Sequence, residues 1–119
     1  MTEHVGAAGK ALESARSLLA ARDRELAQAD AELAEVVASA HAAATEAIRK
    51  LDAVSAEIDA AVAQRTLAAP SEGREFARFL IGKQHEISDI LTTARADADA
   101  KVVVLQKLLD RYWTPSTPL

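Results

Sequence analysis

The sequence predicts an all-α protein: a long antiparallel two-helix hairpin with coiled-coil-like packing, which self-association completes to a helical bundle. No glycine or proline occurs between Gly9 and Pro70. That interval is rich in Ala, Leu, Glu, Gln and Arg, which are strong helix formers. Apolar residues recur at spacings of three, four and seven on both sides of Pro70, as they do on the packed faces of helices. The whole chain, 1–119, is expected to form a single helical domain.

The first helix is expected from about residue 8 to about residue 67. Two heptad series separated by a four-residue step run along it: Leu12, Leu19, Leu26 and Leu33, then Val37, Ala44, Leu51 and Ile58. Such a stutter relaxes a supercoil without ending the helix. A companion series fills the other half of the same face with Ala15, Ala29, Ala40, Ala47, Val54 and Ala61. The alternative is a break near 36–45, which would produce a compact three-helix bundle.

A turn is expected at about residues 68–72, because Pro70 cannot continue the first helix. Ser71 is the expected N-cap of the next helix, since its side chain can accept a hydrogen bond from a free backbone N–H. Glu72 would then lie in the first turn, where the helix dipole favours a negative charge. The second helix is expected over about 73–113.

The second helix carries one apolar stripe. Its members are Phe76, Leu80, Ile87, Leu91, Ala94, Ala98, Val102, Leu105, Leu109 and Tyr112. Pro115 and Pro118 end the helix, and the tail at 114–119 is expected to be disordered. Two ion pairs with i,i+4 spacing are expected on the outer faces of the two helices. They are Glu46 with Lys50 and Asp97 with Lys101.

The position of the turn sets which residues face each other in the hairpin. The expected pairs are Leu51 with Leu91, Ala44 with Ala98, and Val37 with Leu105. The second helix runs out where Tyr112 lies opposite about residue 31, so residues 8–30 are left without a partner in the chain. An unpaired leucine heptad on a soluble protein marks a docking site for another helix.

The predicted partner-binding residues are the leucines of the first series and the two aromatic residues that close the second helix. They are Leu12, Leu19, Leu26, Leu33, Tyr112 and Trp113. Trp and Tyr are frequent anchors in binding interfaces, although this pair could instead cap the end of the bundle. Further apolar positions, Ile48, Val62, Phe79, Ile90 and Leu108, make the stripes wide enough for a bundle. The expected partner is a second copy, giving a homo-oligomer, or another helical protein.

The composition limits the classes of function. The chain has 119 residues, a net charge of −4 and no cysteine. The acidic balance argues against nucleic-acid binding, which needs a concentrated basic face, and the lack of cysteine excludes disulfides and thiolate metal sites. No apolar run approaches the roughly 20 residues that span a bilayer. Because no basic and apolar leader opens the chain, the expected location is cytoplasmic, with signal-independent export left open.

No catalytic, cofactor-binding or metal-binding motif stands out, so the expectation is a protein that is not an enzyme. His85 and Asp89 have i,i+4 spacing, but a stable transition-metal site needs three or four ligands. Asp97 and Asp99 point in different directions on a helix, which makes them a poor acid–base pair. A mixed-charge cluster is expected to be solvated surface, or alternatively to set the register against a partner. It comprises Arg22, Asp23, Arg24 and Glu25.

Residues 74–87, Arg-Glu-Phe-Ala-Arg-Phe-Leu-Ile-Gly-Lys-Gln-His-Glu-Ile, and residues 101–112 resemble a small mycobacterial and actinobacterial family of helical-hairpin proteins. The resemblance implies an accessory or regulatory helical module, because relatives of the domain occur attached to cell-wall peptidoglycan peptidases. More distantly, the chain resembles the hairpins of type VII (ESX) secretion. Their Trp-x-Gly turn is replaced by Ser71-Glu-Gly, and their export signal lacks its acidic residue, since Ser116 stands four residues after Tyr112. The alternative function is therefore a secreted or envelope-associated accessory protein, linked to type VII secretion or to a peptidoglycan hydrolase.

Overall fold

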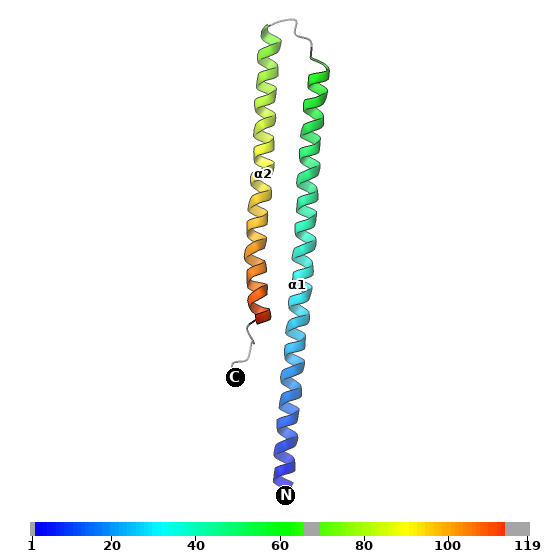
Figure 1. Cartoon of the computed structure of the whole chain (residues 1–119), viewed down its shortest axis with the longest axis vertical. Coiled ribbons are helices and arrows are strands. Elements are labelled where there is room, and N and C mark those ends of the chain that lie inside the picture. Colours follow the sequence, from blue (N-terminus) through cyan, green and yellow to red (C-terminus); the bar gives the residue numbers. More distant parts are fainter. Residues whose placement is uncertain (1, 66–69, 114–119) are drawn as a thin grey trace. The chain divides into compact units, whose positions relative to one another are not determined.

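Two α-helices make up the part of the chain that the computed structural model describes, residues 2–65 and 70–113. Helix α1 spans Thr2–Ala63 and helix α2 spans Pro70–Trp113. The two run antiparallel (Figure 1), so the predicted all-α pair of long antiparallel helices is confirmed. The expected tail at 114–119 and the first part of the expected turn at 68–72 lie outside the described residues.

The chain divides into two units, each of which contains part of both helices. Unit 1 comprises residues 1–37 and 103–119, and unit 2 comprises residues 38–102. In α1 the boundary between the units falls directly after the stutter that separates Leu33 from Val37. Each unit therefore has its own interface between α1 and α2.

Helix α1 runs without a break through residues 36–45, so the alternative three-helix bundle does not form. The helix begins at Thr2, ahead of the expected start near residue 8. Each residue added to an existing helix gains a backbone hydrogen bond, which offsets the modest cost of the glycines in this segment. The helix ends at Ala63, where Gln64 N donates a hydrogen bond to the Ala60 carbonyl oxygen at 3.1 Å.

Helix α2 begins at Pro70. Proline suits the first position of a helix, because its missing N–H would have no helical partner there. Ser71 consequently lies inside the first turn, and its predicted role as the N-cap is wrong. Glu72 in the first turn and Arg111 in the last turn carry the charges that the helix dipole favours at these ends.

In unit 2 the two helices meet along a narrow interface that is rich in alanine. From α1 the half-buried or buried residues are Ala40, Ala43, Ala47, Leu51, Val54, Ile58 and Ala61, so the companion series forms much of the contact. From α2 they are Gly73, Phe76, Phe79, Lys83, Ile87, Ile90, Ala94, Asp97 and Lys101. Val54 is the one fully buried apolar residue among the described residues of this unit.

The residues expected to face each other in unit 2 are only partly enclosed. Leu51 is half-buried, whereas Ala44, Leu91 and Ala98 are exposed. A strict seven-residue repeat drifts by about 20° per heptad around a straight α-helix. The series that starts at Val37 therefore reaches the interface only at Leu51 and Ile58.

In unit 1 the interface is built from larger side chains. It contains Leu26, Ala29, Leu33 and Val36 of α1 and Leu108 and Tyr112 of α2. Ala29 and Leu108 are fully buried. Val37 and Leu105, which were expected to face each other inside the hairpin, are both exposed.

Candidate interaction surface

The first part of α1 is not covered by any other described residue. Every side chain from residue 4 to residue 20 is exposed, and Ala21 is the first that is half-buried. Within unit 1, Figure 1 shows α1 continuing past the end of α2. The unpaired segment is thus shorter at its carboxyl end than the expected 8–30, because the last turn of α2 contacts Arg22.

The six predicted partner-binding residues fall into two groups. Leu26, Leu33 and Tyr112 are half-buried between the helices of unit 1. Leu12, Leu19 and Trp113 have exposed fractions of 55%, 65% and 79%. Only the second group exposes most of its apolar surface.

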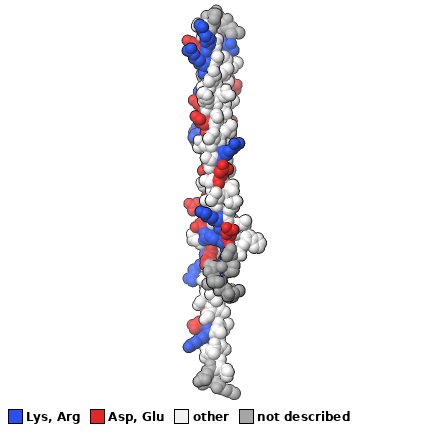
Figure 2. All heavy atoms as spheres, turned by 90° about the vertical axis from the view of Figure 1, so that its left-hand side faces the viewer, with Lys and Arg blue, Asp and Glu red and all other residues white. Residues whose placement is uncertain are grey.

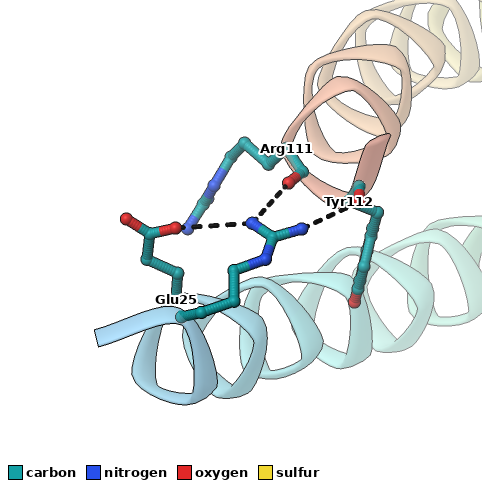
Figure 3. A network of polar contacts seen from close by, with 4 residues as sticks. Glu25, Arg111 and Tyr112 are labelled. Atoms are coloured by element: carbon teal, nitrogen blue, oxygen red, sulfur yellow. Dashed lines mark hydrogen bonds and ion pairs between the residues drawn. The ribbon is translucent and has the colours of Figure 1, made fainter. Parts of the chain in front are cut away.

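Arg22 connects α1 to the carboxyl end of α2. Its Nη2 donates a hydrogen bond to the Tyr112 carbonyl oxygen at 2.9 Å, and its Nη1 donates one to the Arg111 carbonyl oxygen at 3.3 Å. Nη1 also lies 3.4 Å from Glu25 Oε2 (Figure 3). The last carbonyls of a helix have no partner within the helix, so this guanidinium satisfies two of them with a positive charge, which the helix dipole favours.

Two further contacts join the helices at the same level. The Tyr112 hydroxyl donates a hydrogen bond to the Asp30 carboxylate, and Arg111 forms an ion pair with Glu32. The hydrogen bond to Asp30, together with desolvation, raises the pKa of Tyr112. We refer to these residues and Arg22 as the end contacts.

Sequence reasoning missed the end contacts, because Arg22 was assigned to a mixed-charge surface cluster. A signal was nevertheless present in the spacing. Arg22 lies three residues after Leu19 and four before Leu26, so it occupies the apolar face of the helix and not its outer face.

Six exposed apolar residues share one side of the helix pair in unit 1. An α-helix turns by about 100° per residue, which places Leu12, Leu19 and Val37 on one flank of α1 next to the interface. On α2, the flank that is rotated away from the interface in the same direction, seen along the helix from its amino end, carries Leu105, Leu109 and Trp113. Because the helices are antiparallel, the same direction of rotation leads to the same side of the pair. We call these six residues the apolar side of unit 1; all are exposed.

The opposite side of unit 1 is charged. A groove of about 430 Å³ lies there between the helices, lined by Glu32, Glu35, Val36, Val104, Lys107, Leu108 and Arg111. Its rim combines two acidic and two basic side chains. The two sides of unit 1 therefore differ in chemistry: the groove carries four charged side chains beside the exposed Val104, whereas the six apolar residues named above lie on the other side.

Several other charged residues form ion pairs within one helix or across unit 2. Asp97 forms the expected ion pair with Lys101, but the two residues are half-buried in the unit 2 interface and not on an outer face as predicted. Glu46 pairs with Arg49 at 2.6 Å and not with the expected Lys50, and this hydrogen bond lowers the pKa of Glu46. On the face shown in Figure 2, acidic and basic side chains are interspersed.

His85 and Asp89 are both exposed. Within residues 2–65 and 70–113 the structure brings together no group of three His, Asp or Glu side chains that could hold a metal ion. Neither α1 nor α2, over the residues described, includes a stretch long and apolar enough to cross a membrane.

Comparison with known proteins finds relatives of the whole chain. The pattern of a family described as "Domain of unknown function (DUF4226)" matches residues 5–117. The Mycobacterium tuberculosis "Uncharacterized protein MT0028" is 40% identical over 119 residues, which cover 98% of this chain and 99% of that protein. The "Uncharacterized protein MT0029" of the same species is 35% identical over 108 residues, covering 90% of this chain but 24% of that protein. No solved structure matches the chain.

Proposed function

The chain belongs to the DUF4226 family, and we propose that it acts there as a non-enzymatic helical interaction module. In this proposal, the protein associates through the apolar side of unit 1 with a helix of a second copy or of another protein. The observation that carries the proposal is the exposure of Leu12 and Leu19, on a stretch of α1 in which every side chain from residue 4 to residue 20 is exposed.

Two arguments support a helical partner. Leu12 and Leu19 are seven residues apart, so they present to a partner the spacing by which helices pack on one another. Trp113 and Leu109 lie on the same side of unit 1 and enlarge the apolar surface beyond a single stripe. Large aromatic side chains of this kind often carry much of the energy of an interface.

The test replaces Leu12 and Leu19 together by aspartate. Both residues are exposed, so helix content measured by circular dichroism should be retained while association is lost. Light scattering on a sizing column should give a lower mass than for the unmodified chain if the partner is a second copy. If the partner is another protein, the variant should no longer retain the protein that the unmodified chain captures from a mycobacterial lysate.

The matched control carries Ala20→Asp and Ala31→Asp. These exposed residues lie on the outer flank of α1, so the control adds the same charge away from the apolar side. It should keep the mass and the captured partner of the unmodified chain. Association that is equally strong in the Leu12/Leu19 variant and in the control would contradict the proposal.

A second candidate function is an accessory module in the cell envelope or in secretion. The match to 24% of a longer mycobacterial protein favours it, because this type of sequence also occurs as one segment of a larger chain. Under this proposal the protein should appear in the culture filtrate or the envelope fraction of an expressing mycobacterium, without cytosolic marker proteins. Recovery in the cytosol alone would argue against it.

A further inference from the structure

Unit 2 carries a second set of exposed apolar residues, separate from its own helix interface. On α2 these are Leu80, Leu91 and Val102, which recur every eleven residues. Eleven residues make close to three turns of an α-helix and span about 16 Å. The three side chains therefore lie on one flank of α2 at equal intervals, with Leu91 in the middle.

Helix α1 adds Ile48 and Val62 to the same side of unit 2. Seen along each helix from its amino end, Ile48 and Val62 are rotated away from the interface in the same direction as Leu91 is on α2. Because the helices are antiparallel, the same direction of rotation places all three residues on the same side of the pair. Contacts across unit 2 show which residues of α1 and α2 lie at the same height along the helix axes. Arg65 lies over the Phe76 ring at 4.4 Å and Glu57 pairs with Lys83, so Ile48 lies close to the level of Leu91.

The other side of unit 2 carries small and charged side chains. A groove of about 360 Å³ opens there between the helices, with alanines at its base and charged side chains around it. It is lined by Ala43, Glu46, Ala47, Lys50, Asp89, Ile90, Thr93, Ala94 and Asp97. The exposed aliphatic residues of unit 2 named above are thus absent from the lining of this groove and gather on the opposite side.

The surface area of the chain is large enough to supply an interface. The chain exposes 9496 Å², whereas a compact monomer of 12.6 kDa exposes about 6,200 Å². A stable protein–protein interface of standard size buries about 800 Å² on each partner. This excess is summed over the whole chain and includes the uncovered residues 4–20 of α1; in unit 2, Val54 is the one fully buried apolar residue among those described.

We propose that the apolar side of unit 2, formed by Ile48, Val62, Leu80, Leu91 and Val102, packs against the same side of a second copy in antiparallel orientation. The equal spacing of Leu80 and Val102 about Leu91 is what an antiparallel pairing of α2 with a second copy requires. A twofold axis near Leu91 brings the two Leu91 side chains together and sets Leu80 of each copy opposite Val102 of the other. The four helices then enclose aliphatic side chains that one copy leaves exposed.

This inference concerns a different surface from the proposed function, and the two can fail separately. The first experiment compares Leu91→Lys with Ile81→Lys by light scattering over a range of protein concentrations. Leu91 and Ile81 have the same exposed fraction, 53%, but Ile81 lies on the outer flank of α2, away from the apolar side. An unpaired charge in an apolar interface is unfavourable, so Leu91→Lys should raise the dissociation constant of the dimer by at least about tenfold.

The second experiment tests the orientation and does not depend on the stability of the lysine variant. The chain has no cysteine, so a single Leu91→Cys substitution can be treated with a short bifunctional maleimide. It should give a covalent dimer in high yield. Leu80→Cys alone should give little, whereas a mixture of Leu80→Cys and Val102→Cys chains should cross-link.

Three results would overturn the inference. The unmodified chain could be monomeric at all concentrations, Leu91→Lys could leave the mass unchanged, or Leu80→Cys could cross-link to itself as well as Leu91→Cys does. The Leu12/Leu19 variant separates this inference from the proposed function. If it loses association while Leu91→Lys does not, the proposed function stands and the unit 2 interface is rejected.

Discussion

The two units join the same pair of helices with different side chains. In unit 1 the interface contains Leu26, Leu33 and Leu108, and the end contacts centred on Arg22 hold the last turn of α2. In unit 2 the alanines Ala40, Ala43, Ala47 and Ala94 lie at the end of the interface away from the turn, whereas larger apolar side chains form its middle and the part nearer the turn. Unit 1 therefore depends on a few large residues at the end of α2, whereas unit 2 distributes its packing over a longer row of small and large residues.

The contacts of unit 2 near the turn show how it compensates for small side chains. The rings of Phe76 and Phe79 lie 6.2 Å apart, and the Lys83 ammonium lies 5.3 Å above the Phe79 ring. Lys83 also pairs with Glu57 and Glu86, and these hydrogen bonds raise the pKa of Lys83. Aromatic and cation–π contacts thus supplement an interface whose alanines contribute little apolar area.

Truncation of the buried leucine of unit 1 should have the largest effect. Leu108→Ala removes a buried side chain from a small interface and should cost about 2–5 kcal/mol of unfolding free energy. Val54→Ala in unit 2 removes two carbons and should cost less, about 2 kcal/mol from the transfer free energy of its methyl groups. Urea denaturation followed by circular dichroism measures both.

Hydrogen exchange of backbone amides measures the loss of stability separately in each unit. In the Leu108→Ala protein, amides of α2 after about residue 103 should exchange faster, with little change in the rest of that helix. Equal losses of stability in the two variants, or uniform exchange along α2, would show that the units do not differ in the way proposed.

Removal of one end contact should have a smaller effect that depends on pH. Because the pKa of Tyr112 is raised by its bond to Asp30, the bond contributes stability that is fully present below the ordinary tyrosine pKa of about 10. That contribution is lost as the pH rises through the raised pKa. The unmodified chain should thus melt above the Tyr112→Phe variant at pH 8, and the difference should shrink at pH 11. A difference that grows with pH would contradict this assignment.

Much of the fold could be predicted, because local rules and helix packing agree. The interval without glycine or proline, the density of strong helix formers and the break at Pro70 favour two long helices in any packing. The position of Ser71 was predicted less well. The N-cap and first-turn positions are only one or two residues apart. The helix starts where Pro70 can occupy the first helical position, which places Ser71 inside the first turn.

The candidate surface could be predicted only in part. Leu12 and Leu19 were expected to be free and are exposed, but Leu26 and Leu33 belong to the same heptad series and are half-buried. The difference follows from where α2 ends: its last turn contacts Arg22, so Leu26 and Leu33 lie beside α2, whereas no described residue covers Leu12 and Leu19. Spacing alone does not show at which turn the series meets α2.

The amino-acid sequence by itself determined the helical character of this protein, the single break between its helices and their antiparallel order. Helix propensity and hydrophobic periodicity act over a few residues, so they can be recognised without a structure. The tertiary structure decided which flank of each helix stays exposed, and it brought Arg22 to the end of α2. These features depend on the rotation and register of one helix relative to the other. Contacts between side chains that are far apart in the sequence determine both.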